Sequence, residues 1–105
     1  ESFLSLVLHR LRGHGLYIFD EPEAALSPSR QMALLCAIHS LVQQGSQVLM
    51  ATHSPILMAY APGVIYQLDG EGIHKTDYKD TEHYQLTLRF LLDPESMLKR
   101  LFADE

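Results

Sequence analysis

Several features that would point to particular protein classes are missing from this sequence. It contains one cysteine, Cys36, in 105 residues, so no disulfide can form within the chain, and we expect a reducing compartment, the cytoplasm. The net charge of −5 argues against a nucleic-acid-binding surface. No apolar run approaches the roughly 20 residues that a membrane-spanning helix needs, so we expect no membrane segment. The composition, 47% hydrophobic and 20% charged, is that of a globular protein with a core.

Short apolar runs alternate with helical patterns along the chain, which predicts an α/β fold with a mainly parallel sheet. No linker interrupts the pattern, so residues 1–105 are expected to form one domain or part of one. The run Leu16–Phe19 has no polar alternation, which predicts a strand buried on both faces. Cys36 lies in an apolar helical pattern and is predicted to fill a small space in the core. The expected strands are 16–19, 48–51, 64–68 and 72–76, and the expected helices are 2–12, 28–44, 55–61, 81–92 and 94–102.

Proline and glycine mark the expected ends of these elements. Ser27 followed by Pro28 predicts a helix start, with a side-chain cap and a proline at the first helical position. Ser54 followed by Pro55 predicts a second helix start of the same kind. Asp69-Gly70 predicts a hairpin turn that joins the last two strands.

Polar side chains follow the first two strands at the point where each strand ends. Asp20 and Glu21 come after the first strand, and His53, between Thr52 and Ser54, comes after the second. Because ligands bind beyond the carboxyl ends of parallel strands, we expect these groups to share one edge of the sheet. Two other interpretations stay open, in which the acids only form a turn and a helix start and His53 is a solvated turn residue.

These residue types meet the demands of phosphoryl transfer from a nucleotide. Asp20 is suited to hold magnesium through a bound water. Glu21, one residue later and turned the other way, is suited to orient or deprotonate the attacking water. His53 is suited to donate to the phosphate that is transferred.

Two stretches carry a family resemblance. LYIFDEPEAALSP resembles the Walker B and D-loop region of the ATP-binding cassette class of P-loop ATPases, and QVLMATHSP resembles the switch strand and H-loop of that class. With GVIYQLDGEGIHKTDYKDTEHYQ, the run looks like the C-terminal part of a bacterial group of stand-alone cassette-type ATPases. The resemblance implies part of a three-layer P-loop fold. It also implies that Asp20 is the Walker B aspartate, Glu21 the catalytic glutamate and His53 the switch histidine that senses the γ-phosphate.

The resemblance further implies ATP and Mg²⁺ as ligands and a homodimer that closes on the nucleotide. Leu26 and Ser27 would belong to the D-loop at the dimer interface, although the class usually has aspartate where Ser27 stands. Glu1 would be the last residue of a diverged signature motif. No G-x-x-x-x-G-K-[S/T] occurs in the sequence, so the phosphate-cradling loop must be supplied from elsewhere. We therefore expect the C-terminal lobe of a larger ATPase domain, inactive by itself.

Two other function classes stay open at this point. A helicase-type P-loop protein also holds magnesium with an acidic strand end, but the loop at 26–28 and the strand end at 52–54 argue against it. The other is a non-catalytic half-cassette that serves as a dimerisation or interaction module. An exposed apolar sheet edge left by the missing N-terminal half would favour such pairing.

Overall fold

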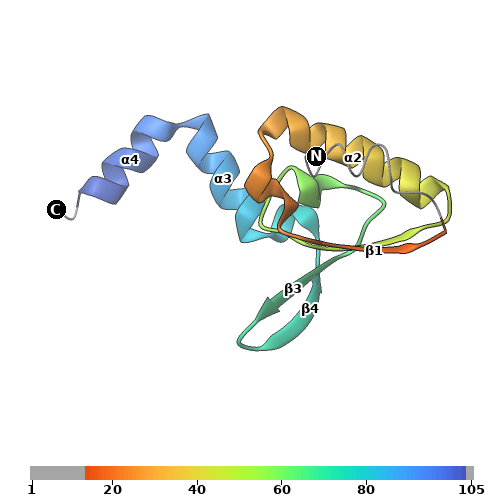
Figure 1. Ribbon diagram of the computed structural model, residues 1–105. Helices are drawn as coiled ribbons and strands as arrows, with labels where there is room; N and C mark the ends of the chain where they lie inside the picture. The colour runs from red at the N-terminus through yellow and green to blue at the C-terminus, as the bar shows by residue number, and fades with distance from the viewer. Residues whose placement is uncertain (1–13, 104–105) are drawn as a thin grey trace. The chain divides into compact units, whose positions relative to one another are not determined.

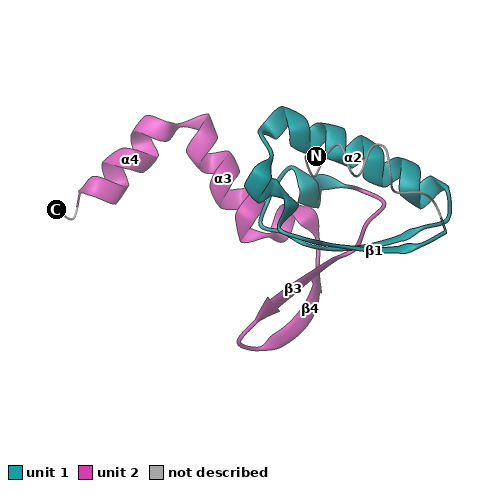
Figure 2. Cartoon of the chain, viewed as in Figure 1, with its two compact units in different colours: residues 1–60 teal, residues 61–105 magenta. Residues whose placement is uncertain are grey.

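The computed structural model describes residues 14–103. The chain divides into two compact units that meet in the sequence between Tyr60 and Ala61 (Figure 2). The expected helix over 2–12 and the proposed signature residue Glu1 lie outside the described residues.

The first unit is built around a parallel pair of strands. Its elements are β1 (Leu16–Asp20), η1 (Pro22–Ala25), α2 (Pro28–Gln43), β2 (Gln47–Ala51) and η2 (Leu57–Ala59). The two strands pair in parallel from Leu16 opposite Gln47 to Asp20 opposite Ala51. Parallel strands need a long crossover between them, and α2 provides it along one face of the pair (Figure 1).

Local signals set the ends of α2 as the sequence predicts. The Ser27 side chain accepts a hydrogen bond from the Arg30 backbone N–H, at 3.3 Å, and Pro28 begins the helix. After the helix, Gly45 has a φ of +95°, a left-handed conformation that a residue with a Cβ adopts at a cost. The backbone N–H of Gly45 donates to the carbonyl of Val42, which closes the end of the helix.

The core of this unit lies between α2 and one face of the strand pair. Phe19, Leu34, Ile38 and Leu57 form the buried cluster, and Leu34 is 0% exposed. Buried residues on α2 recur at positions 31, 34, 38 and 41, which is the spacing of one helical face. Cys36 lies off this face and is exposed, so the prediction that it fills the core is wrong.

The other face of the strand pair is not covered by the described residues. Leu16, Ile18 and Leu49 are 60%, 68% and 62% exposed. Side chains alternate between the two faces of a strand, and here Tyr17 and Phe19 face the core while Leu16 and Ile18 face away. The prediction that this strand is buried on both faces is therefore wrong for the described residues. We call Leu16, Ile18 and Leu49 the open face.

The second unit is an antiparallel hairpin followed by two helices. Its elements are β3 (Ile65–Asp69), β4 (Gly72–Thr76), η3 (Tyr78–Asp80), α3 (Glu82–Leu92) and α4 (Pro94–Phe102). The predicted hairpin turn is confirmed, because Asp69 pairs with Gly72 and its carboxylate accepts from the Glu71 N–H at 2.8 Å. Thr81 and Asp93 cap the two helices.

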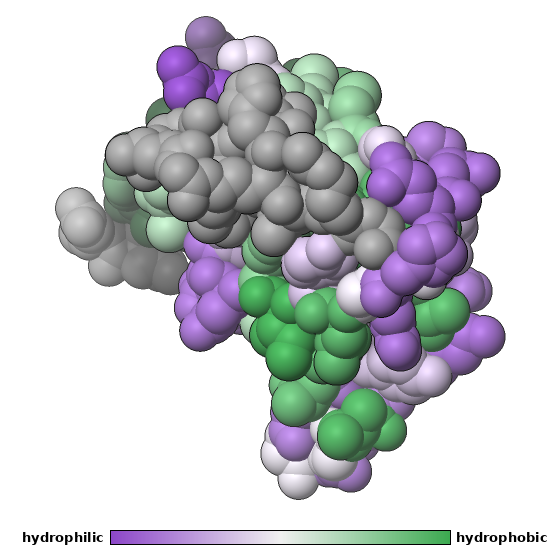
Figure 3. All heavy atoms as spheres, turned by 45° about the vertical axis from the view of Figure 1, so that its right-hand side comes forward, coloured by the Kyte–Doolittle hydropathy of each residue, from purple (hydrophilic) through white to green (hydrophobic). Residues whose placement is uncertain are grey.

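Apolar surface is exposed in both units, and part of it appears in green in Figure 3.

Two expectations about the fold need correction. Within the described residues, β3 pairs only with β4, so a mainly parallel sheet is confirmed only for β1 and β2. The helix expected after Ser54 and Pro55 is the single turn η2. Tyr60 leaves the helical conformation at ψ 100°, and Pro62-Gly63 follow too closely for a longer helix. No helix over residues 14–103 is long and apolar enough to cross a membrane.

Candidate functional site

Parallel pairing brings the two polar strand ends together. Asp20 lies opposite Ala51 in the register of β1 and β2. The ladder continues one step further, because the Glu21 backbone N–H donates to the carbonyl of Ala51 at 2.7 Å. The backbones of Glu21 and Thr52 therefore leave the sheet side by side, and the predicted convergence of the two strand ends is confirmed.

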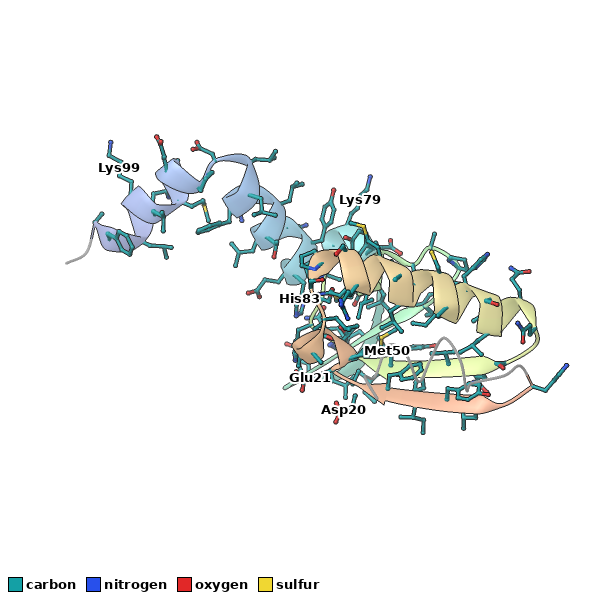
Figure 4. All side chains as sticks on the ribbon, turned by 45° about the horizontal axis from the view of Figure 1, so that its top comes forward. Asp20, Glu21, Met50, Lys79, His83 and Lys99 are labelled. Atoms are coloured by element: carbon teal, nitrogen blue, oxygen red, sulfur yellow. The ribbon has the colours of Figure 1, made fainter. Side chains whose placement is uncertain are left out.

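Asp20 is the last residue of β1 and is exposed. By alternation along the strand, its side chain lies on the same face as Ile18, away from α2, and Figure 4 shows it at the strand end beside Glu21. Over residues 14–103, no cluster of three His, Cys or acidic ligands includes Asp20. A site with one or two exposed carboxylates fits Mg²⁺, which keeps several waters and is held by one or two carboxylates plus phosphate oxygens.

Glu21 has an unusual backbone. Its φ of 47° and ψ of 56° place it in the left-handed region, although it carries a Cβ. The following residue, Pro22, is buried at the start of η1 and disfavours the right-handed helical conformation for the residue before it. Such conformations cost free energy and recur at functional sites. The chain turns here in one residue, from the sheet edge directly into η1.

Glu23, which the sequence analysis did not single out, connects the two strand ends. Its Oε1 accepts a hydrogen bond from the Thr52 hydroxyl at 2.7 Å, and its Oε2 accepts from the His53 backbone N–H at 2.8 Å. Burial alone would raise the pKa of Glu23, but the His53 and Thr52 hydrogen bonds outweigh it and hold the pKa below its usual value. The only sequence signal was a further acid two residues after Glu21.

A second set of contacts holds the other side of the His53 segment. The Ser54 hydroxyl donates to the Gln31 side-chain oxygen and accepts from the Leu57 N–H at 3.1 Å. Gln31, on α2, also donates through Nε2 to the carbonyl of Leu26 at 3.2 Å. Gln31 and Ser54 are both buried. The residues on either side of His53 are thus tied down, Thr52 to Glu23 in η1 and Ser54 to Gln31 on α2, while His53 is itself exposed.

The two D-loop candidates lie between η1 and α2. Leu26 ends η1, its N–H donates to the Glu23 carbonyl at 3.0 Å, and its side chain is half-buried against the core. Ser27 is exposed, and its hydroxyl caps α2. These contacts account for the local structure of both residues, and their placement at a dimer interface stays a prediction.

A separate group of possible metal ligands lies in the β3–β4 hairpin. The ligand atoms of Asp69, Glu71 and His74 lie within 4.8 Å of one another. Hydrogen bonds from the Glu71 N–H and the His74 side chain lower the pKa of Asp69. The turn and the cross-strand pair with His74 explain this cluster without a metal ion.

Comparisons with known proteins match the chain to one family model and to two ATP-binding/permease proteins. The model of a family described as "AAA domain, putative AbiEii toxin, Type IV TA system" matches residues 2–59. The chain is 30% identical over 98 residues, or 93% of its length, to the Macrolide export ATP-binding/permease protein MacB of Campylobacter jejuni subsp. jejuni serotype O:23/36 (strain 81-176). It is 31% identical over 68 residues, or 65% of its length, to the protein of the same name from Hahella chejuensis (strain KCTC 2396).

The matched region is a small part of each relative. The chain spans 15% of the length of the Campylobacter protein and 10% of the Hahella protein. No solved structure matches the chain.

Proposed function

Because the chain belongs to the AAA-domain family whose model matches residues 2–59, we propose that it is the C-terminal lobe of an ATPase of the cassette type. The observation that carries this proposal is the parallel register of β1 and β2. It brings the Asp20-Glu21 pair and the Thr52-His53 strand end to one edge of the sheet. The ATP binding named in both relatives supports the same reading.

Each of the three site residues has a distinct role in this proposal. Asp20 would hold Mg²⁺, with a water between them, and the ion would supply positive charge that offsets the charge on the phosphate oxygens. Glu21 accepts a hydrogen bond from the attacking water and orients it, or takes its proton. His53 donates to the γ-phosphate, where negative charge develops during transfer.

The rest of the ATPase domain must supply what these 105 residues lack. They contain no phosphate-cradling loop, and the open face of the strand pair exposes three large aliphatic side chains. Burial of each is worth about 1.5–3 kcal/mol, so the open face is a surface that the missing half of the domain would cover. The 105-residue piece alone should therefore bind ATP weakly and not hydrolyse it.

In the complete protein we propose a homodimer that closes on ATP, with Leu26 and Ser27 at the interface. The position of Ser27 supports this arrangement, since it is exposed directly before α2. We also propose the cytoplasm as its compartment, because ATP is available there.

The test uses the full-length protein and compares Glu21→Gln with Glu71→Gln. Glu71 lies in the exposed turn of the hairpin, so its replacement removes the same charge away from the proposed site. Calorimetry with Mg-ATP should show that both variants bind, while only Glu21→Gln loses turnover. Equal turnover by the two variants would remove Glu21 from the mechanism. Equally tight ATP binding by the 105-residue piece alone would contradict the proposed division of the site.

A second candidate function is a non-catalytic half-cassette that pairs with another chain. The observation that favours it is the same open face, formed by Leu16, Ile18 and Leu49. Sedimentation of the 105-residue chain without nucleotide distinguishes the two candidates. A stable dimer that Ile18→Lys dissociates would favour the interaction module, and a monomer would favour the lobe of a larger domain.

A further inference from the structure

The carboxylate of Glu23 binds the stretch of chain that carries the proposed switch histidine. Its two oxygens accept hydrogen bonds from two consecutive residues, the Thr52 hydroxyl at 2.7 Å and the His53 backbone N–H at 2.8 Å. Both hydrogen bonds reach the Thr52-His53 stretch outside the imidazole ring, so they act on the main chain, while the carboxylate also interacts electrostatically with the ring.

We propose that Glu23 is a positioning residue that fixes the backbone of Thr52 and His53 and thereby aims His53 at the phosphate. The proposal rests on the function proposed above, because it assigns Glu23 a part in the work of His53. It adds a fourth side chain to the site formed by Asp20, Glu21 and His53.

The chemistry of the contact requires a carboxylate. Two donors, an O–H and an N–H, converge on Glu23, and an ionised carboxylate accepts from both. A glutamine side chain has one acceptor oxygen, and its NH₂ group would face the second donor. Hydrogen bonds to an ionised acceptor are also stronger than neutral ones. An alanine would leave both donors without this partner.

Thr52 extends the contact toward Ser54. Its hydroxyl donates to Glu23 and accepts from the Ser54 N–H at 3.0 Å. Ser54 is held in turn by the buried side chain of Gln31. The three residues 52–54 are thus bound on both sides, so the exposed His53 side chain projects from a fixed stretch of backbone.

Glu23 also ties the histidine to the proposed catalytic glutamate. Only Pro22 separates Glu21 from Glu23 in the sequence, and the Glu21 N–H bonds directly to the end of β2. A water-orienting carboxylate and a phosphate-binding imidazole must keep their spacing to within a fraction of an ångström during phosphoryl transfer. Glu23 and the Glu21 backbone bond together hold that spacing from both strand ends.

The test is a double-mutant cycle on ATP turnover by the full-length protein, with Glu23→Ala, His53→Ala and the double variant. Glu23→Ala should lower kcat by about 10- to 100-fold, as a displaced catalytic group does, with a smaller change in KM for ATP. In the His53→Ala background, the same change should lower kcat less than about 2-fold, because residues that act as a unit are not additive.

Two further variants separate positioning from general damage. Glu23→Gln keeps one acceptor oxygen, so its kcat should lie between those of the wild type and Glu23→Ala. It also replaces Glu23→Ala in the cycle if the alanine variant does not fold. Glu71→Gln, the matched control in the hairpin, should have the kcat and KM of the wild type. Hydrogen exchange of the His53 amide should quicken in Glu23→Ala and Glu23→Gln and stay unchanged in Glu71→Gln.

The outcomes distinguish this inference from the proposed function. If His53→Ala abolishes turnover while Glu23→Ala leaves it unchanged, the positioning role is wrong and the proposed function stands. If the two single losses multiply in the double variant, Glu23 does not act through His53. If the protein hydrolyses no ATP, the proposed function fails. If His53→Ala has no effect on turnover, the role proposed for His53 fails, and the positioning role of Glu23 fails with it. Unchanged exchange of the His53 amide in the Glu23 variants would overturn the backbone contact independently of turnover.

Discussion

The left-handed backbone of Glu21 leads to a prediction about stability that is independent of catalysis. Both Glu21→Asn and Glu21→Gln replace the carboxylate with a neutral amide, so both should abolish ATP turnover. They differ in how well they accept φ 47° and ψ 56°. Asparagine enters this region more readily than longer side chains, because its short amide can bond the local backbone. The Asn variant should therefore be the more stable of the two.

The magnitude follows from the cost of the left-handed conformation. That cost is about 1–2 kcal/mol for an ordinary L-residue, and asparagine recovers part of it, so we expect a difference of about 1 kcal/mol. With a urea dependence of about 2 kcal/mol per molar, the unfolding midpoint of the Asn variant should lie about 0.5 M higher. The assay is urea unfolding of both full-length variants, followed by circular dichroism.

A matched pair at a helical glutamate provides the control. Glu95 lies in the first turn of α4, where glutamine has a slightly better helix propensity than asparagine. The same two substitutions there should give no advantage to asparagine. If Glu21→Asn is no more stable than Glu21→Gln, or if Glu95 shows the same difference, the left-handed turn at Glu21 is not a source of strain.

Two other predictions address the contacts of Glu23 and the open face. Because the folded-state pKa of Glu23 is lowered, its charge stabilises the protein above its unfolded pKa of about 4.3. The stability difference between wild type and Glu23→Gln should therefore be largest at pH 7 and should shrink as the pH falls below about 4. Urea titrations at several pH values would measure it. A difference that does not change with pH would contradict the ionised contact. Ile18→Lys should destabilise the full-length protein by several kcal/mol if the open face is covered there. In the 105-residue chain, the same change should alter the stability by no more than about 0.5 kcal/mol. Equal effects in both proteins would mean that the open face is exposed to solvent in both.

Much of the local structure could be predicted from the sequence because its causes are local. Ser27 caps the helix that it precedes, and Thr81 and Asp93 cap the next two helices through bonds to the third residue after each. The hairpin follows from Asp69 and the glycines beside it. These interactions join residues two or three positions apart, so the unfolded chain already contains all the information that they need.

The meeting of the two strand ends could also be predicted, because alternating strands and helices form parallel pairs whose ends share one edge. The roles of Glu23 and Gln31 could not. Glu23 bonds to residues 29 and 30 positions later, and Gln31 bonds to a serine 23 positions later. Their partners come within reach only after α2 has folded back over the strands.

The tertiary structure also decided which apolar residues are buried. The run from Leu16 to Phe19 is uniformly apolar, so its sequence does not distinguish one face from the other. Packing of α2 covers Tyr17 and Phe19, while no described residue covers Leu16 and Ile18. The sequence alone determined the caps, the turns and the polar strand ends, since each depends on neighbouring residues. Only the folded chain decided which carboxylate holds the histidine segment and which face stays open, because both depend on contacts between distant residues.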